Sequence, residues 1–129
     1  MKKRLILLAI AAILLVTAGC AGGVKAYTDS AQTINISTNQ TFIIALDSNP
    51  TTGYSWQASY DESRLELVGK SYETNEQANQ GVVGAGGVEY FQFKALKAGK
   101  TEVTLVYQRP WEEQSIDQKV FTVKIVLNP

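Results

Sequence analysis

The chain has 129 residues, which is room for one domain and a short targeting segment but not for two domains. It contains no histidine, so nucleophilic catalysis by a Ser-His or Cys-His pair within one chain is excluded. Its 12 basic and 12 acidic residues balance, and beyond the first four residues no cluster of Lys and Arg marks it as a nucleic-acid-binding protein. No metal-ligand cluster and no distinctive carboxylate pair stands out. We therefore expect no enzyme activity, no cofactor and no metal site.

The N-terminus has the features of a secretory signal peptide. Three basic residues follow Met1, and residues 5–16 are an unbroken apolar run. That run is shorter than the about 20 apolar residues that a membrane-spanning helix needs. We therefore predict a signal peptide over residues 1–19. Its removal leaves 9 basic and 12 acidic residues, a formal charge of −3.

The only cysteine, Cys20, follows the small residues Thr17, Ala18 and Gly19. It has no partner for a disulfide bond within the chain. The segment Thr17-Ala18-Gly19-Cys20 resembles the lipobox of prokaryotic lipoproteins, in which the cysteine is lipidated and becomes the new N-terminus. An ordinary cleaved signal with an incidental cysteine is the alternative. The resemblance predicts an exported protein anchored through Cys20 to a membrane of the cell envelope, in the periplasm or at the cell surface.

Small, polar and glycine-containing residues over positions 20–30 predict a tether, with the folded domain over residues 31–129. From there on, apolar residues alternate with period two, as half-buried strands require. The alternating sets are, in order, Ile34 and Ile36; Phe42, Ile44 and Leu46; Tyr54, Trp56 and Ala58; residues 65–70, continuing towards Tyr72; Phe91, Phe93 and Ala95; Val103, Leu105 and Tyr107; and Phe121, Val123, Ile125 and Leu127.

Turn residues separate these predicted strands, at Asn39-Gln40, Asn49-Pro50, Asp61-Glu62-Ser63 and Ala98-Gly99-Lys100. Only the signal peptide has helical character. The pattern predicts an all-β fold, an immunoglobulin-like antiparallel sandwich or barrel of seven or eight strands. The cysteine pair of immunoglobulin domains is absent, so packing alone has to hold the sheets together.

The first loop of interest is Asn49-Pro50-Thr51-Thr52-Gly53, which leads into Tyr54 and Trp56. Proline fixes its own φ, glycine can take a positive φ, and β-branched threonines are stiff at χ1. Such a loop is pre-organised for binding. The alternative is a simple turn between strands, with both aromatic residues in the core.

The second loop contains Gly84-Ala85-Gly86-Gly87. It lacks the Gly-Lys-Ser/Thr sequence and the following helix of a phosphate-binding loop. It is either a flexible linker or a loop whose bare backbone lies flat against a partner.

The third loop is Arg109-Pro110-Trp111, directly after the sixth predicted strand. We expect Trp111 to be exposed there, and Trp and Arg are enriched among interface hot spots. In the alternative, Trp111 folds back over the end of the sandwich and Arg109 pairs with Glu112 or Glu113.

In an immunoglobulin-like sandwich, alternate loops emerge at the same end, so we expect these three loops side by side. In this order and spacing they resemble the three signature loops of the chagasin family of cysteine peptidase inhibitors. The resemblance extends from about Gln32 to the C-terminus. It rests on Asn49, Pro50, Thr51, Thr52, Gly53, Tyr54 and Trp56, on Gly84, Ala85, Gly86 and Gly87, and on Arg109, Pro110 and Trp111.

This resemblance implies a reversible, non-covalent inhibitor that blocks the active-site cleft of papain-like cysteine peptidases. We separately expect the protein to be a monomer. Residues 49–53 would be the central wedge, with Thr51 and Thr52 at its tip. Residues 84–87 would lie along the non-primed side of the cleft, and residues 109–111 would cover the primed side.

Two other functions are compatible with the residues themselves. Exposed Trp111 and tyrosines would suit a surface-anchored adhesion or carbohydrate-binding module, because immunoglobulin-like folds host many functions. The other is a structural lipoprotein whose loops bind nothing specific.

Overall fold

The computed structural model describes residues 24–74 and 86–128. The predicted signal peptide, Cys20, Gly84 and Ala85 lie outside the described residues. No helix in the described part of the chain is long and apolar enough to cross a membrane.

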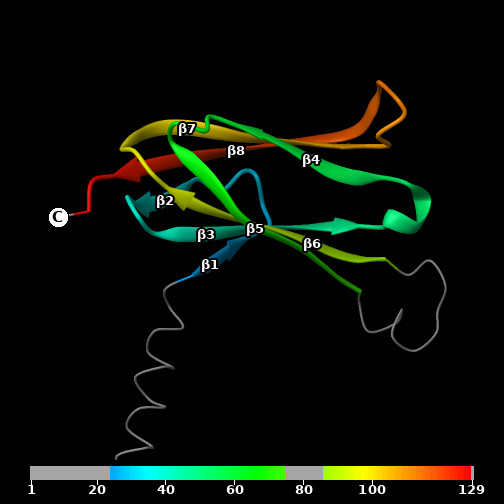
Figure 1. Ribbon diagram of the computed structural model, residues 1–129, viewed down its shortest axis with the longest axis horizontal. Coiled ribbons are helices and arrows are strands. Elements are labelled where there is room, and N and C mark those ends of the chain that lie inside the picture. The colour runs from blue at the N-terminus through cyan, green and yellow to red at the C-terminus, as the bar shows by residue number, and fades with distance from the viewer. Residues whose placement is uncertain (1–23, 75–85, 129) are drawn as a thin grey trace, which may run out of the picture.

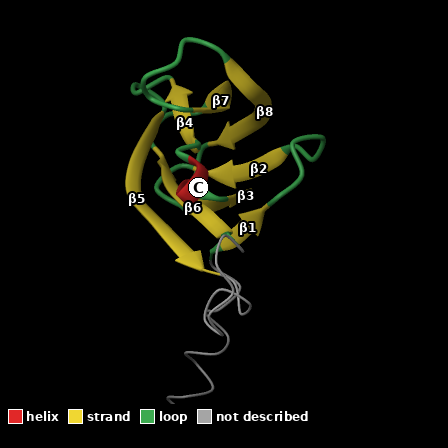
Figure 2. Cartoon of the chain, turned by 90° about the vertical axis from the view of Figure 1, so that its right-hand side faces the viewer, coloured by secondary structure: helices red, strands yellow, loops and turns green. Residues whose placement is uncertain are grey.

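The described residues form eight β-strands in two four-stranded sheets, which face each other as a sandwich (Figures 1 and 2). The first sheet has the order β1-β3-β6-β5, and the second has the order β2-β8-β7-β4. The strands are β1 (Lys25–Tyr27), β2 (Ile34–Ser37), β3 (Thr41–Ser48), β4 (Ser55–Tyr60), β5 (Leu65–Thr74), β6 (Gly87–Ala95), β7 (Gly99–Gln108) and β8 (Ser115–Val126). The all-β, immunoglobulin-like prediction is confirmed.

The core is built from the residues that the period-two pattern selects. Every second side chain of a strand points between the sheets, and the ten largest of the fully buried ones form the centre of the core. They are Phe42, Phe91, Phe93, Phe121, Ile34, Ile44, Leu65, Leu105, Val103 and Val123. The rings of Phe42 and Phe93 stack at 5.6 Å between centroids, across the antiparallel β3–β6 pair.

Two edge pairings differ from the antiparallel expectation. β1 pairs with β3 in parallel, and β2 pairs with β8 in parallel. The reason is connectivity: β1 and β3 are not consecutive, because the chain crosses to the second sheet as β2 between them. Only strands that are joined by a hairpin are obliged to run antiparallel.

The tether predicted over residues 20–30 is shorter than expected. Lys25–Tyr27 form β1, and Tyr27 is buried with its ring edge against Phe42. The folded domain therefore begins at Lys25 and not at residue 31. At the other end, Leu127 does not join the core as predicted, since it lies beyond β8 and is 74% exposed.

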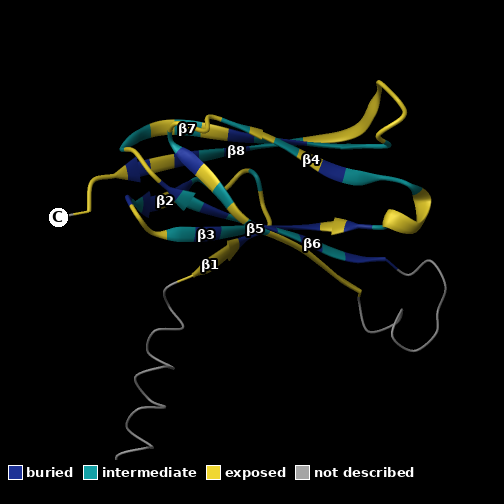
Figure 3. Cartoon of the chain, viewed as in Figure 1, coloured by how far each residue is buried: buried dark blue, intermediate teal, exposed yellow. Residues whose placement is uncertain are grey.

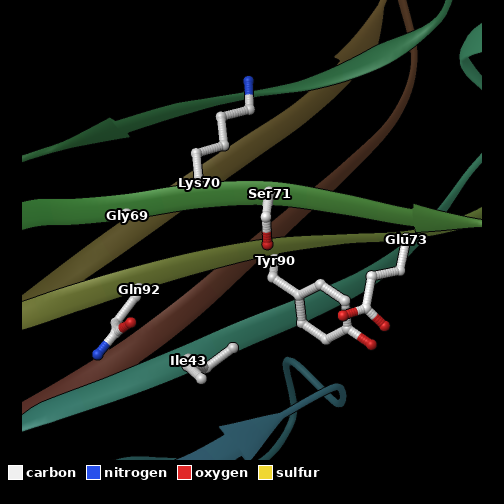
Figure 4. Close-up of a pocket in the computed structure, with 7 residues that line it drawn as sticks. All are labelled: Ile43, Gly69, Lys70, Ser71, Glu73, Tyr90 and Gln92. Carbon is white, nitrogen blue, oxygen red and sulfur yellow. The ribbon is translucent and has the colours of Figure 1, made fainter.

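The strand β5 continues to Thr74, beyond the predicted limit, and changes face along its length. Its register against β6 shifts between Leu67 and Gly69. After this bulge Lys70 lies on the core side, with its Nζ 5.2 Å from the centre of the Phe91 ring. Figure 4 shows the other side, where Ser71 points away from Lys70 into a shallow hollow of about 470 Å³ on the outer face of the sheet.

The turn between β4 and β5, which is not part of the three loops, is stabilised by hydrogen bonds to the Asp61 carboxylate. The Ser63 amide and hydroxyl both donate to the Asp61 carboxylate. These hydrogen bonds, from the side chain first and then the backbone, lower the pKa of Asp61 from its ordinary value of 3.8. A lowered folded-state pKa stabilises the fold above the unfolded-state pKa, and this contribution is lost as the pH falls through the folded-state pKa.

We therefore expect Ser63→Ala to lower the free energy of unfolding at pH 7, with a difference from the native chain that shrinks below about pH 4. Urea denaturation at several pH values measures this difference. A difference that stays constant across this range would contradict the assignment.

Candidate functional site

Residues 49–54, in the first loop between β3 and β4, and residues 109–114, in the third loop between β7 and β8, lie at one end of the sandwich (Figure 1). Gly87 pairs with both Ser48 and Thr74, so the described ends of β5 and β6, which flank the second loop, lie at the same end. Figure 3 shows the first and third as exposed segments at that end. The first and third touch, because the Arg109 Nε donates to the Thr52 carbonyl at 3.0 Å. The described end of the second, Gly86, packs against Ser48 and Asn49. The prediction that the loops lie side by side is confirmed for the described residues.

The first loop is a rigid turn. Pro50–Thr52 form a single 3₁₀ turn, and the Gly53 amide closes it by donating to the Pro50 carbonyl at 2.9 Å. The Asn49 carbonyl accepts from the amide of Thr52 at 3.1 Å and from its hydroxyl at 2.7 Å. The Thr51 hydroxyl donates to the Asn49 side-chain oxygen. Thr51 and Thr52 are exposed at the tip, so the loop presents two threonines on a fixed backbone.

The third loop presents Trp111 to solvent. Its side chain is 72% exposed, as the sequence predicts. The alternative prediction for Arg109 also holds in part, because its guanidinium lies 3.5 Å from the Glu112 carboxylate. The same guanidinium lies over the Tyr54 ring, 4.4 Å from its centre. Together with its bond to Thr52, these contacts make Arg109 the residue that holds the third loop against the first.

The contact between the first and third loops requires a glycine at position 53. It has a φ of +88°, in the left-handed region that favours glycine. A Cβ atom there would lie 2.7 Å from Cη2 of Trp111 and 3.5 Å from Cγ of Arg109. The indole edge therefore rests on the bare backbone of the first loop.

We expect Gly53→Ala to lower the free energy of unfolding by about 1–2 kcal/mol, because alanine is strained in this region and its methyl group displaces Trp111. Denaturation followed by tryptophan fluorescence measures both effects. Gly69→Ala is the matched control: Gly69 has an ordinary φ, and its added Cβ would meet only the Gln92 side chain, at 3.8 Å. Equal losses in the two variants would contradict this role for Gly53.

Gly86 and Gly87 are also required by the chain itself. Gly86 has a φ of +79°, and a Cβ atom there would lie 2.9 Å from the Ser48 carbonyl oxygen. A Cβ atom at Gly87 would overlap the backbone of Glu73. The resemblance explains the glycines of this loop by the room that a partner needs. At these two positions the backbones of β3 and β5 already leave no room for a side chain.

Trp56 belongs to the matched motif but lies in the core, as the alternative interpretation of the first loop expected. It is 3% exposed, so it supports the first loop from within. Its Nε1 donates to the Asp47 carbonyl at 2.9 Å, and its ring lies 4.8 Å from that of Tyr107. The Tyr107 hydroxyl in turn accepts from the Asn49 amide at 2.8 Å, and the Tyr54 ring stacks on the Tyr107 ring at 5.4 Å.

Sequence reasoning missed Glu89, which is buried between the sheets at 4% exposure. Its carboxylate accepts from the Trp56 amide at 3.1 Å and so links β6 of one sheet to the edge strand β4 of the other. The sequence does contain a signal for its burial. Glu89 stands in the same alternating series as Phe91 and Phe93, whose side chains are buried. A carboxylate at such a position has to find a donor when it is buried.

Comparison with known proteins agrees with this geometry. The sequence model of the chagasin family peptidase inhibitors (I42) matches residues 35–125. The chain is 34% identical to Amoebiasin-2 of Entamoeba histolytica over 95 residues, which cover 74% of this chain and 76% of that protein. It is 33% identical to Chagasin of Trypanosoma cruzi over 102 residues, 74% of this chain and 89% of that protein.

Among solved structures, the crystal structure of a cysteine protease inhibitor from Entamoeba histolytica superposes with a TM-score of 0.68. It is 28% identical in sequence, and the match covers 79% of this chain and 95% of that chain. With most of the domain matched by the family and by two relatives above 30% identity, this chain belongs to the chagasin family of peptidase inhibitors.

Proposed function

We propose that this protein is a reversible, non-covalent inhibitor of papain-like cysteine peptidases, and that it blocks their active-site cleft with the three loops. The observation that carries the proposal is the rigid turn at residues 50–52, braced by Arg109 on one side and by Tyr107 on the other. A turn that is already ordered loses little entropy on binding, which leaves more of its contact energy for affinity.

The turn also explains how such a loop could enter a cleft built to cut peptides and stay intact. The carbonyl of Asn49 accepts two hydrogen bonds within the loop, and the carbonyl of Pro50 accepts one from Gly53. The Thr52 carbonyl accepts from Arg109. These three carbonyl oxygens are occupied by the chain's own donors, so they are not free to enter an enzyme's oxyanion hole.

The roles of the individual residues follow from this placement. Thr51 and Thr52 would meet the catalytic cysteine and histidine, and Trp111 would cover the primed side of the cleft. The loop that includes Gly84 and Ala85 would run along the non-primed side. Tyr54, Trp56 and Arg109 would act mainly by holding the wedge and Trp111 in place.

The direct test is a titration of papain with the chain from residue 20 onwards, carrying Cys20→Ser, with a serine peptidase as control. The proposal expects stoichiometric loss of papain activity and no effect on the control enzyme. Folded protein that leaves papain fully active at micromolar concentration would contradict a general inhibitor of this class. It would favour the adhesion or carbohydrate-binding alternative. Binding of a glycan that is lost on mutation of Trp111 would then establish that alternative.

We expect Thr51→Asp to weaken papain inhibition about 10-fold, or roughly 1.4 kcal/mol. The new carboxylate would be buried without a partner beside the enzyme's thiolate, and it would also face the Asn49 side-chain oxygen that now accepts from Thr51. Inhibition constants of the two proteins measure the effect. Thr51→Ser keeps the hydroxyl and is the control; tighter inhibition by Thr51→Asp would rule out a wedge at the catalytic site.

We also propose that the protein is an exported, monomeric lipoprotein held at the cell envelope through Cys20. The support is the basic and apolar N-terminal segment followed by Thr17-Ala18-Gly19-Cys20. Incorporation of labelled fatty acid into the expressed chain, abolished by Cys20→Ala, would be the expected result. Release of an unlabelled chain into the medium would favour an ordinary cleaved signal.

A further inference from the structure

The strand β1 determines where the chain enters the domain. The Tyr27 ring is 6% exposed and lies edge-on to the Phe42 ring, with 6.4 Å between centroids. Backbone pairing with β3 runs from Lys25 opposite Phe42 to Tyr27 opposite Ile44. The chain is therefore fixed to the sandwich from Lys25 onwards.

The direction of β1 places this attachment far from the three loops. β1 is parallel to β3, and β3 leads from Thr41 directly into the first loop. Lys25 is opposite Phe42, near the start of β3, so six residues of β3 separate its level from Ser48. At about 3.3 Å per residue this separation is roughly 20 Å. Figure 1 shows β1 and the C-terminal end of the chain towards one end of the sandwich and the first and third loops at the other.

The chain between the predicted anchor and β1 is short. Four residues lie between Cys20 and Lys25, so five Cα–Cα steps join the two. Fully extended, they reach about 18 Å at most. If the loops faced the membrane, Lys25 would stand at least the roughly 20 Å length of β3 above it, plus the height of the loop. The tether is too short for this inverted arrangement.

We propose that the anchored protein presents its three loops away from the membrane, and that it captures soluble peptidases arriving from the aqueous side. In this orientation the three loops do not reach a peptidase whose cleft is held at the surface of the same membrane. This inference rests on the lipid anchor and the inhibitory function proposed above. It adds the orientation of the inhibitor and hence the kind of target that it can meet.

The experiment uses the chain from residue 20 onwards, in which Cys20 is the only thiol. Coupling this thiol to a maleimide lipid in phosphatidylcholine vesicles supplies the anchor without the cell's lipidation. The inverted comparison is Cys20→Ser with Glu113→Cys, because Glu113 is exposed in the connection that carries Trp111. Both chains are first titrated against papain while uncoupled, and the second also after capping with a small maleimide.

With the anchor at Cys20, papain inhibition should stay within about 3-fold of the uncoupled chain. With the anchor at Glu113→Cys, it should fall by at least about 10-fold. Energy transfer from Trp111 to a dansyl-labelled lipid headgroup should be weak with the anchor at Cys20 and strong with the anchor at Glu113→Cys. The Trp111→Phe variant of each chain measures the part of the transfer that comes from Trp56.

Equal energy transfer in the two arrangements, or equal loss of inhibition, would overturn the proposed orientation. If neither uncoupled chain inhibits papain, the inhibitory function fails, and the energy transfer still decides the orientation. Failure of native lipidation at Cys20 would count against the anchor alone, because the maleimide coupling does not depend on it.

Discussion

Trp111→Ala is expected to weaken inhibition of papain by about 2 kcal/mol or more, roughly a 30-fold rise in the inhibition constant. The side chain is 72% exposed and rests by one edge on Gly53. It therefore has a large aromatic surface to bury against a partner and little burial to lose on unfolding. The free energy of unfolding should stay within about 0.5 kcal/mol of the native value. Inhibition constants and urea denaturation measure the two quantities.

Ile116→Ala is the matched control for this variant. Ile116 is also apolar, is 61% exposed and lies at the start of β8, close in sequence to Trp111 but outside the three signature loops. We expect it to change inhibition by less than about 3-fold. Equal losses in the two variants would indicate a general effect of apolar surface. Unchanged inhibition by Trp111→Ala would remove Trp111 from the interface.

Seven of the eight strands could be predicted because period-two alternation is a strong local signal. Phe42, Ile44 and Leu46 in β3 show it clearly, and all three are buried. The strand β1 could not be found in this way, since it has three residues and only Tyr27 is buried. Its place in the fold depends on parallel pairing with β3, which is a contact across the sequence and leaves no local pattern.

The three loops could be predicted as a group, because strand order alone puts alternate connections at one end. The contacts among them could not. Arg109 was expected in the contact surface, or alternatively in a pair with Glu112 or Glu113. Its guanidinium lies beside Glu112, and it also holds Thr52 and Tyr54 of the first loop. A contact between segments far apart in the sequence, such as that of Arg109 with Thr52, leaves no local pattern by which it could be predicted.

The two tryptophans of the chain show this difference between surface and support. A motif match treats Trp56 and Trp111 alike, as aromatic residues of signature loops. Alternation separates them, because Trp56 has the inward parity of β4, whereas Trp111 follows Pro110 in a connection. The structure places one at 3% exposure and the other at 72%. Substitution of Trp111 should therefore weaken inhibition, whereas substitution of Trp56 should mainly lower the free energy of unfolding.

Trp56→Ala is accordingly expected to lower the free energy of unfolding by about 3–5 kcal/mol, a large part of the 5–15 kcal/mol of a typical domain. It removes a buried ring that packs on Tyr107 and leaves the Asp47 carbonyl without its indole donor. Because Tyr107 also holds Asn49, inhibition should weaken even in the fraction that stays folded. Trp56→Phe keeps a ring and loses only part of the packing and the donor, so its loss should be clearly smaller. Urea denaturation measures both variants, and a loss below about 1 kcal/mol for Trp56→Ala would show that the wedge does not depend on this residue for support.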